Sequence, residues 1–350
     1  MAINTIARGS GARPPSAPGG CCAQLVKFLW SWMGVMFNYA LHPSNFYREF
    51  CTRPQTFKEA PNRSGEVAVL TGGTKGIGLE VLKKLLESKF HVIIGCRSLI
   101  AGEEVMTSIR NGGITTGSCK VFELDLKSLK SVRRFAENVL REAPRIDLLI
   151  NNAGVMFAPY EITEDLCESQ FQVNYLSHFV LTNLLLPRMK ETSRRSDKHV
   201  ACRIVNVASD ANYGGHIDFD NLEQCKVYVS NKAYSDSKLC QILHAYYLDS
   251  LLRSEDIKVN VLSLHPGVIV SDLWNNMPSV VVAIVNMFKW MLRTTEDGAK
   301  TVIYTALSPK LEGVGGVYIN SCEIVQPVSQ VSDISIQKRL WDKSLELGKI

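Results

Sequence analysis

Short apolar runs rich in β-branched residues alternate with longer amphipathic stretches from residue 66 to about residue 320. The runs predict strands, and the stretches between them, such as 76–88, repeat their apolar positions at helical spacing. Strands joined through helices need right-handed parallel crossovers, which place helices on both faces of one sheet. The pattern therefore predicts one α/β domain over 66–320, a doubly wound parallel sheet in three α/β/α layers. The predicted strands are 66–70, 91–95, 121–124, 147–151, 203–207, 258–264 and 316–319.

The N-terminal 65 residues do not follow this alternation. Residues 1–24 are rich in Gly, Pro, Ala and Ser and predict a flexible leader. Residues 25–41 contain a single charge, Lys27, and reach the short limit of a membrane-spanning helix, which needs ~17–25 residues. We predict a membrane anchor over 25–41, a linker over 42–65 and, after the domain, a partly helical tail over 321–350.

Two other interpretations of residues 25–41 stay open. The absence of acidic residues before Glu49 is typical of a mitochondrial transit peptide. Alternatively, the segment is an extra helix that packs on the domain. Basic residues are more numerous after the segment than before it, which favours a cytosolic catalytic domain on the endoplasmic reticulum membrane. The adjacent Cys21 and Cys22 are candidates for acylation, and the domain is expected to fold without residues 1–59.

Composition excludes several classes of function. The chain is 46% hydrophobic and 21% charged, as globular proteins are. Its net charge of +5 is small and scattered, so we expect no nucleic-acid partner. The ten cysteines and seven histidines show no metal-ligand spacing, so we predict no metal site and structural roles for the histidines.

A glycine-rich turn follows the first predicted strand and opens a helix. Glycines there let main-chain N–H groups approach a pyrophosphate, and the helix N-terminus adds positive partial charge. The residues expected to contact a dinucleotide are Gly72, Thr74, Lys75, Gly76, Ile77 and Gly78.

The end of the second strand indicates which dinucleotide is preferred. An NAD enzyme places Asp or Glu there for the ribose 2′-OH, whereas this chain has Arg97 and no acid. Arg97 and Lys75 together suit a 2′-phosphate. We therefore expect NADP(H) to be preferred over NAD(H), with two solvated surface cations as the alternative.

Other polar or flexible residues follow the remaining strands. Ligands of doubly wound sheets bind at the carboxyl ends of the strands, so residues there are further candidates for cofactor binding. They are Asp125, Leu126, Asn152, Ala153, Gly154, Pro266, Gly267, Ile269 and Ser271.

Tyr234 and Lys238 are four residues apart in a predicted helix and so share one face. A tyrosine with its ordinary pKa of about 10 is a poor acid or base at neutral pH. The Lys238 ammonium and an oxidised nicotinamide ring would both lower that pKa. Ser209 follows the fifth strand, where its hydroxyl would stabilise charge on a carbonyl oxygen. These residues predict an acid/base pair with a hydrogen-bond donor beside it.

In this order, the motifs resemble those of the short-chain dehydrogenases/reductases, over roughly residues 66–320. The segments INNAGVMF at 150–157, NYLSHFVLTNLLL at 174–186 and LEGVGGVY at 311–318 are similar to the retinol-dehydrogenase-like branch. The resemblance implies a Rossmann fold. It also implies a catalytic set of Asn174, Ser209, Tyr234 and Lys238, in which Asn174 holds a water that passes protons to Lys238 and the Tyr–Lys pair also contacts the cofactor.

The same resemblance implies a lipophilic alcohol, aldehyde or ketone of retinoid, isoprenoid or steroid type as substrate. The apolar stretch 277–292 follows the sixth strand, where relatives carry a substrate lid. Either it lines a greasy pocket and dips into a membrane surface, or it is buried in a homodimer. NAD-linked oxidation of the alcohol is one rival function. A cofactor-binding regulator without turnover is another, although the complete catalytic set argues against it.

Overall fold

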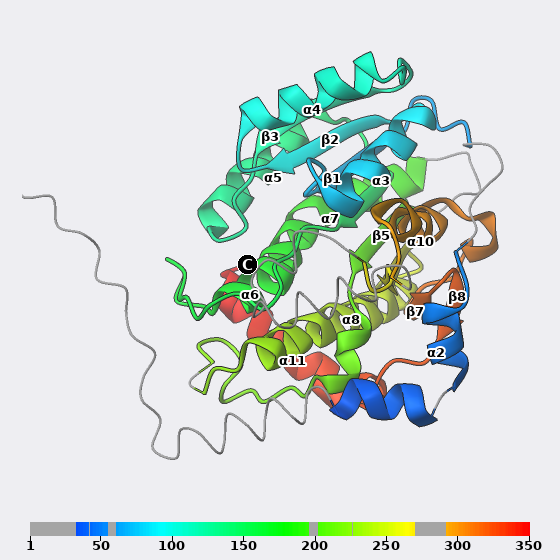
Figure 1. Ribbon diagram of the computed structural model, residues 1–350. Coiled ribbons are helices and arrows are strands. Elements are labelled where there is room, and N and C mark those ends of the chain that lie inside the picture. The colour runs from blue at the N-terminus through cyan, green and yellow to red at the C-terminus, as the bar shows by residue number, and fades with distance from the viewer. Residues whose placement is uncertain (1–32, 42, 55–60, 196–201, 226, 270–291) are drawn as a thin grey trace, which may run out of the picture.

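The computed structural model describes residues 33–41, 43–54, 61–195, 202–225, 227–269 and 292–350. Within these residues one eight-stranded sheet has the order β3-β2-β1-β4-β5-β6-β7-β8 (Figure 1). All neighbouring strands pair in parallel except β7 and β8, which are antiparallel. The predicted doubly wound α/β fold is confirmed.

The strands lie close to their predicted positions, except that β3 begins at Ser118 rather than at residue 121. This strand is at the sheet edge and only partly buried, so its sequence lacks a continuous apolar run. The strands are β1 (Val67–Thr71), β2 (His91–Cys96), β3 (Ser118–Glu123), β4 (Leu148–Asn151), β5 (Cys202–Val207), β6 (Val259–His265), β7 (Val317–Asn320) and β8 (Glu323–Val325).

Helices cover both faces of the sheet (Figure 1). The α-helices are α2 (Pro43–Phe50), α3 (Gly76–Glu87), α4 (Leu99–Asn111), α5 (Leu129–Glu142), α6 (Ser169–Phe171), α7 (Ser177–Arg195), α8 (Ser230–Ser254), α10 (Thr295–Leu307) and α11 (Ile334–Gly348). A π-helical turn, η1 (Gln172–Leu176), precedes α7, and the 3₁₀ turns are η2 (Asp210–Gly214), η5 (Pro309–Leu311) and η6 (Ser329–Ser332).

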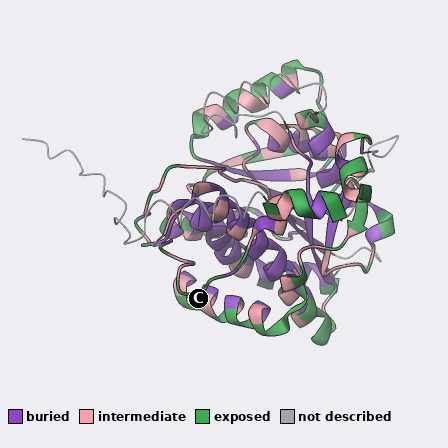
Figure 2. Cartoon of the chain, turned by 60° about the horizontal axis from the view of Figure 1, so that its bottom comes forward, coloured by how far each residue is buried: buried purple, intermediate pink, exposed green. Residues whose placement is uncertain are grey.

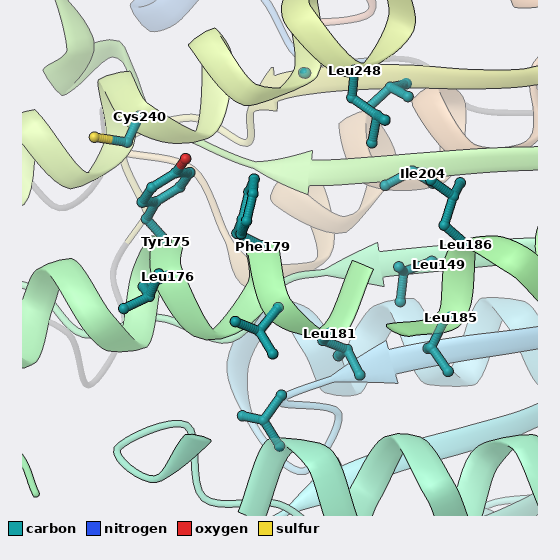
Figure 3. Packing of buried hydrophobic residues seen from close by; sticks show 14 of the residues in the cluster. Leu149, Tyr175, Leu176, Phe179, Leu181, Leu185, Leu186, Ile204, Cys240 and Leu248 are labelled. Atoms are coloured by element: carbon teal, nitrogen blue, oxygen red, sulfur yellow. The ribbon is translucent and has the colours of Figure 1, made fainter. Parts of the chain in front are cut away.

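Two apolar cores lie on opposite faces of the sheet because successive strand residues point to opposite sides. In β1, Val67 and Val69 join the core under α5, α7, α8 and α11, whereas Ala68 and Leu70 join the core under α3 and α10. Figure 3 shows Tyr175 and Phe179 of the first core pointing toward α8. Burial is concentrated in the strands and the central helices (Figure 2). Each large apolar side chain buried in this way contributes roughly 1.5–3 kcal/mol.

The C-terminal residues belong to this domain, so the predicted boundary at residue 320 divides a continuous structure. Strand β8 extends the sheet, and α11 packs on the first core, where Leu340 is buried. The Ser344 hydroxyl lies 2.7 Å from the hydroxyl of Tyr175, and the Trp341 ring centroid is 5.0 Å from that of Phe179. The sequence pattern predicts the helix but does not reveal these distant partners.

The N-terminal segment also differs from its prediction. Residues 33–41 are helical, and α2 occupies part of the predicted linker, beside β7 and β8 (Figure 1). Tyr39 donates a hydrogen bond to Asp210 Oδ2 at 3.2 Å, and the side chain of Glu49 is buried. The leader 1–24 and residues 25–32 of the predicted anchor lie outside the described residues. None of the helices that the structure describes is long and apolar enough to cross a bilayer.

Candidate active site

The glycine-rich turn connects β1 to α3 and brings main chain close to main chain. Gly72 has φ +70°, and a Cβ on Gly78 would lie 2.0 Å from the carbonyl oxygen of Gly72. Gly76 has φ +57°, with no atom within 4 Å of where its Cβ would stand. Lys75 is exposed directly before α3. The open side of this turn at a helix N-terminus fits a pyrophosphate.

The loop after β4 is fixed against this turn by Thr71. Its hydroxyl accepts hydrogen bonds from the main-chain N–H groups of Asn152 and Ala153, at 3.0 Å each. The side-chain amide of Asn152 donates in return to the carbonyl oxygens of Thr71, at 2.9 Å, and Gly72, at 3.2 Å. The two loops predicted to bind the cofactor therefore form one rigid unit.

A buried histidine supports this unit from behind. His178 Nδ1 lies 3.0 Å from the carbonyl oxygen of Asn174, which can only accept, so Nδ1 carries the proton. Nε2 then accepts from the Thr71 hydroxyl at 2.9 Å. Burial lowers the pKa of His178 to about 4, which keeps the ring neutral at physiological pH. The sequence predicts a structural role for the histidines but does not indicate this link.

Tyr234 and Lys238 lie side by side on α8. Lys238 Nζ is 5.7 Å from the centroid of the Tyr234 ring, and both side chains are buried. Nζ donates to the carbonyl oxygen of Val207 at 2.7 Å and to Gln241 Oε1 at 3.0 Å. The amine is thus held at the end of β5, where Ser209 follows.

Burial determines the protonation of this pair. It raises the pKa of Tyr234 to about 12, although a hydrogen bond with Ser209 acts in the opposite direction. It also lowers the pKa of Lys238 to about 7. The expected lowering of the Tyr234 pKa is therefore not found for the chain alone, because burial outweighs the hydrogen bond with Ser209. The positive ring of a bound oxidised nicotinamide would still favour the phenolate.

Asn174 lies in η1 and connects the loop after β4 to α8. Its Nδ2 donates to the carbonyl oxygen of Val155 and to Ser237 Oγ, both at 2.9 Å, and its Oδ1 accepts from the N–H of Val155 at 2.8 Å. A Cβ on Gly154 would lie 3.2 Å from Asn174 Oδ1 and 3.6 Å from Lys238 Nζ. These contacts bring Asn174, Gly154 and Lys238 together at the carboxyl ends of the strands.

The predicted adenosine-side residues stand at the ends of neighbouring strands. Arg97 is exposed directly after β2, and the N–H of Gly72 donates to the carbonyl oxygen of Gly95 in that strand at 3.2 Å. Asp125 follows β3, and its Oδ1 accepts from the N–H of Lys127 at 3.0 Å. The Ser177 hydroxyl donates to the carbonyl oxygen of Leu126 at 2.6 Å.

The loop after β6 lies at the same carboxyl ends of the strands, on the side of the sheet away from β2 and β3. Pro266 and Gly267 are buried, and Gly267 has φ +105°. Ile269 packs near Ile77, since a Cβ on Gly298 would lie 2.2 Å from Ile269 Cδ1 and 3.3 Å from Ile77 Cγ1. Ser271 and residues 277–291 of the predicted lid stretch lie outside the described residues.

A cluster of buried ionisable residues, which the sequence pattern does not predict, lies beside this loop. Its members are Glu49, Asp210, His265 and Arg293. Burial alone would raise the pKa of Glu49, but His265 and Arg293 outweigh it and lower that pKa to about 2. The HPG sequence at 265–267 points to the loop, but no local pattern points to Glu49.

Comparisons with known proteins agree with this arrangement. The family model of the short chain dehydrogenase matches residues 66–280. The chain is 39% identical over 292 residues to retinol dehydrogenase 14 of Mus musculus, covering 80% of this chain and 85% of that protein. It is 35% identical over 288 residues to polyprenol dehydrogenase of Homo sapiens, covering 82% and 86%.

Solved structures show the same fold. A crystal structure of a Mycobacterium paratuberculosis protein has a TM-score of 0.67 and 30% identity, and the match covers 85% of this chain and 98% of that one. The RhlG/NADP active-site complex of Pseudomonas aeruginosa has a TM-score of 0.58 and 25% identity, with 75% and 97% covered. The family match, the relatives and the sheet order lead to one conclusion. The chain is an oxidoreductase of the short-chain dehydrogenase/reductase superfamily, in its retinol-dehydrogenase-like branch, which acts on CH–OH groups with a nicotinamide cofactor.

Proposed function

We propose that this chain transfers a hydride between NADP(H) and a lipophilic alcohol, or its aldehyde or ketone, with Tyr234 as the acid/base. The observation that carries the proposal is the meeting of Tyr234, Ser209 and Lys238 at one point of the sheet edge. When bound, the nicotinamide supplies or accepts the hydride. Tyr234 passes a proton to the carbonyl oxygen in reduction and removes it from the alcohol in oxidation.

The other side chains hold charge and protons in place. Ser209 donates a hydrogen bond to the substrate oxygen and stabilises the charge that develops there. Lys238, with a pKa of about 7, gains and loses a proton readily at neutral pH and returns protons to Tyr234. Asn174 orders the water of that path at its carbonyl oxygen, which has a second lone pair beside the one used by His178.

Cofactor preference rests on Arg97 and Lys75, which offer positive charge at the end of β2 and in the glycine turn. A 2′-phosphate would pair with both. The NADP complex of the similar Pseudomonas aeruginosa structure supports NADP(H) over NAD(H). Gly72, Gly76, Gly78, Asn152 and Asp125 would hold the remainder of the dinucleotide; the other proposed cofactor contacts are Thr74, Ile77, Leu126, Ala153, Gly154, Tyr234, Lys238, Pro266, Gly267, Ile269 and Ser271.

A lipophilic substrate and a membrane surface belong to the same proposal. The relatives named retinol and polyprenol dehydrogenase support the substrate class. In the N-terminal helix 33–41, four apolar residues at helical spacing are each 56–64% exposed, namely Met33, Met36, Phe37 and Leu41. Phe46 and Tyr47 of α2 are also exposed. Such a surface suits the lipid interface. We therefore include in the proposal an enzyme on the endoplasmic reticulum membrane, with its catalytic domain on the cytosolic side that the basic residues after residue 41 favour.

The test is turnover by the full-length protein in detergent or nanodiscs. Retinal, long-chain and isoprenoid aldehydes and a short water-soluble aldehyde are offered with NADPH or NADH, and the alcohol product is quantified. We expect lipophilic carbonyl compounds with NADPH to react fastest. Tyr234→Phe should lower kcat by about 10²–10⁴-fold and leave NADPH binding almost unchanged, since only the hydroxyl is removed. Tight NADPH binding without turnover would favour the regulator, and a variant that kept half of kcat would refute the role of Tyr234.

A further inference from the structure

Glu49 reaches from α2 into the loop after β6, although α2 lies outside the residues that match the family model. Its side chain is 1% exposed. Oε1 accepts from the main-chain N–H of Val268 at 2.5 Å, while Oε2 lies 3.3 Å from His265 Nε2 and 3.5 Å from Arg293 Nη2. The carboxylate of Glu49, in the N-terminal segment, therefore contacts the loop itself, His265 directly before it, and Arg293.

Arg293 also contacts this loop. Its main-chain N–H donates to the carbonyl oxygen of Val268 at 3.0 Å, and its guanidinium lies over Gly267, where a Cβ would be 2.4 Å from Arg293 Cδ. Nη2 donates to the carbonyl oxygen of Arg48 at 2.7 Å and to that of Glu49 at 3.2 Å. The loop is thus held by both α2 and Arg293, which also contact each other.

The network continues to the residue after Ser209. His265 Nδ1 accepts from the main-chain N–H of Asp210 at 3.2 Å, so a neutral His265 carries its proton on Nε2, which faces Glu49. The Asp210 carboxylate accepts from Tyr318 Oη at 2.7 Å and from Tyr39 Oη at 3.2 Å. The N-terminal residues Tyr39 and Glu49 therefore support both the loop after β6 and the turn that carries Ser209.

Glu49, Asp210 and His265 could also be considered a metal site, since their ligand atoms lie within 4.8 Å of one another. Arg293 argues against that use, because its guanidinium already gives Glu49 a positive partner inside the protein. A divalent cation added there would be repelled by the guanidinium at short range. A buried carboxylate is tolerated when it is paired and hydrogen-bonded, and Glu49 meets both conditions without a metal.

We propose that Glu49 is a positioning residue of the active site, which with Arg293 holds the loop 266–269 in the conformation that receives the nicotinamide end of the cofactor. The inference rests on the proposed function, because that function gives the loop its role at the cofactor. The N-terminal segment is then part of the catalytic unit and not only a tether to the membrane. Removing the carboxylate frees the Val268 N–H and takes from the buried Arg293 the anion with which it pairs among the described residues.

The experiment compares full-length wild type with Glu49→Ala and Glu49→Gln. Glu323→Gln is the matched control, because it removes the exposed 2.7 Å ion pair between Arg48 and Glu323 that also holds α2, without touching the loop. Each protein is titrated with NADPH, assayed for kcat and KM, and analysed by amide hydrogen exchange over residues 261–269.

For Glu49→Ala we expect the Kd and KM for NADPH to rise about 10-fold or more, since a hydrogen bond to a charged group is lost. At saturating NADPH, kcat should stay within about threefold of wild type. Exchange at the Val268 amide should accelerate while that of β1 and β5 does not. Glu49→Gln, which keeps an amide oxygen for Val268, should give smaller changes in the same direction, and Glu323→Gln should match wild type.

The inference would be overturned if both Glu49 variants bound NADPH and exchanged their amides as the wild type does. It would also be overturned if they lost only kcat. Should Glu49→Ala fail to fold, Glu49→Gln decides. Activity that is lost on chelation and restored by zinc would assign the cluster to a metal instead. A wild type that binds NADPH without turnover would overturn the proposed function alone, since Kd and exchange need no turnover. A wild type that binds no nicotinamide cofactor would overturn both.

Discussion

Lys238 donates a 2.7 Å hydrogen bond to the carbonyl oxygen of Val207, the last residue of β5. This contact fixes the amine of α8 to the strand that leads into Ser209. The main chain of β5 and α8 therefore fixes the distance between the proposed catalytic side chains. Burying the Lys238 amine also costs more hydration free energy than burying an apolar side chain in its place. The arrangement has a measurable consequence for stability.

The first prediction concerns Lys238→Met in the cofactor-free protein. The pKa of Lys238 falls from 10.5 to about 7 on burial, so between these values the unfolded chain binds a proton that the folded chain does not. Unfolding free energy of the wild type therefore contains a contribution that rises with pH in this window. The difference in unfolding free energy between the wild type and the variant should therefore rise by up to about 1.4 kcal/mol per pH unit, in favour of the wild type, from pH 7 toward pH 10. Urea unfolding at several pH values measures this, and parallel pH profiles would contradict it.

A second prediction concerns the joint between the two cofactor loops. Thr71→Val keeps the shape of the side chain but takes away the acceptor of the Ala153 N–H and one of the two acceptors of the Asn152 N–H, which also donates to the carbonyl oxygen of Ile150 at 3.1 Å. Each unsatisfied buried donor costs roughly 1–3 kcal/mol, so the variant should unfold more easily and bind NADPH about 10-fold more weakly. Thr305→Val is the control, because its buried hydroxyl only donates to the carbonyl oxygen of Thr301 within α10. Equal NADPH affinity in the two variants, measured by calorimetry, would exclude this role of Thr71.

Cofactor preference gives the third prediction. Arg97→Asp should weaken NADPH far more than NADH, because a carboxylate replaces the partner of the 2′-phosphate. The loss of one charge-assisted hydrogen bond costs about 1.5–3 kcal/mol, and repulsion adds to it. Lys84→Asp, in the last turn of α3, makes the same charge change away from the glycine turn and should affect both cofactors little. An equal loss of both cofactors in Arg97→Asp, seen in Kd measurements, would refute the assignment.

The parts of the structure that could be predicted are those that short stretches of sequence determine. Apolar runs located the central strands, and Gly72 and Gly78 marked the turn whose main-chain contacts admit no side chain. The four-residue spacing of Tyr234 and Lys238 brought them to one side of a helix. Each of these features depends on neighbours in the chain or on a repeating period.

What could not be predicted depends on partners far apart in the sequence. Glu49 is 219 positions from Val268, and Thr71 is 107 from His178. The linker prediction failed because α2 is stabilised by such distant contacts. For the chain without its cofactor, the expected direction of the Tyr234 pKa shift was wrong for the same reason, since the shift follows from the degree of burial. Burial is set by the packing of the whole domain.

The last prediction revises the expectation that the domain folds without residues 1–59. A chain of residues 60–350 lacks both Tyr39 and Glu49, so Arg293 would lose its carboxylate partner together with the carbonyl oxygens of Arg48 and Glu49. Breaking a pair whose remaining charge stays buried costs about 3–5 kcal/mol. The loss of stability here should be smaller, because removing α2 also lets water reach the guanidinium. A chain of residues 33–350 keeps these contacts, and its unfolding free energy and Kd for NADPH should match those of the full-length protein.

Urea unfolding and NADPH titration of the three chains test this directly. The shortest chain should unfold at a lower urea concentration and bind NADPH more weakly, whereas sedimentation with anionic vesicles should still retain the 33–350 chain through Met33, Met36 and Phe37. Replacing Met36 and Phe37 by Asp should release that chain without changing its NADPH affinity, because both side chains are exposed. A 60–350 chain as stable as the 33–350 chain would show that the N-terminal helices only rest on the domain.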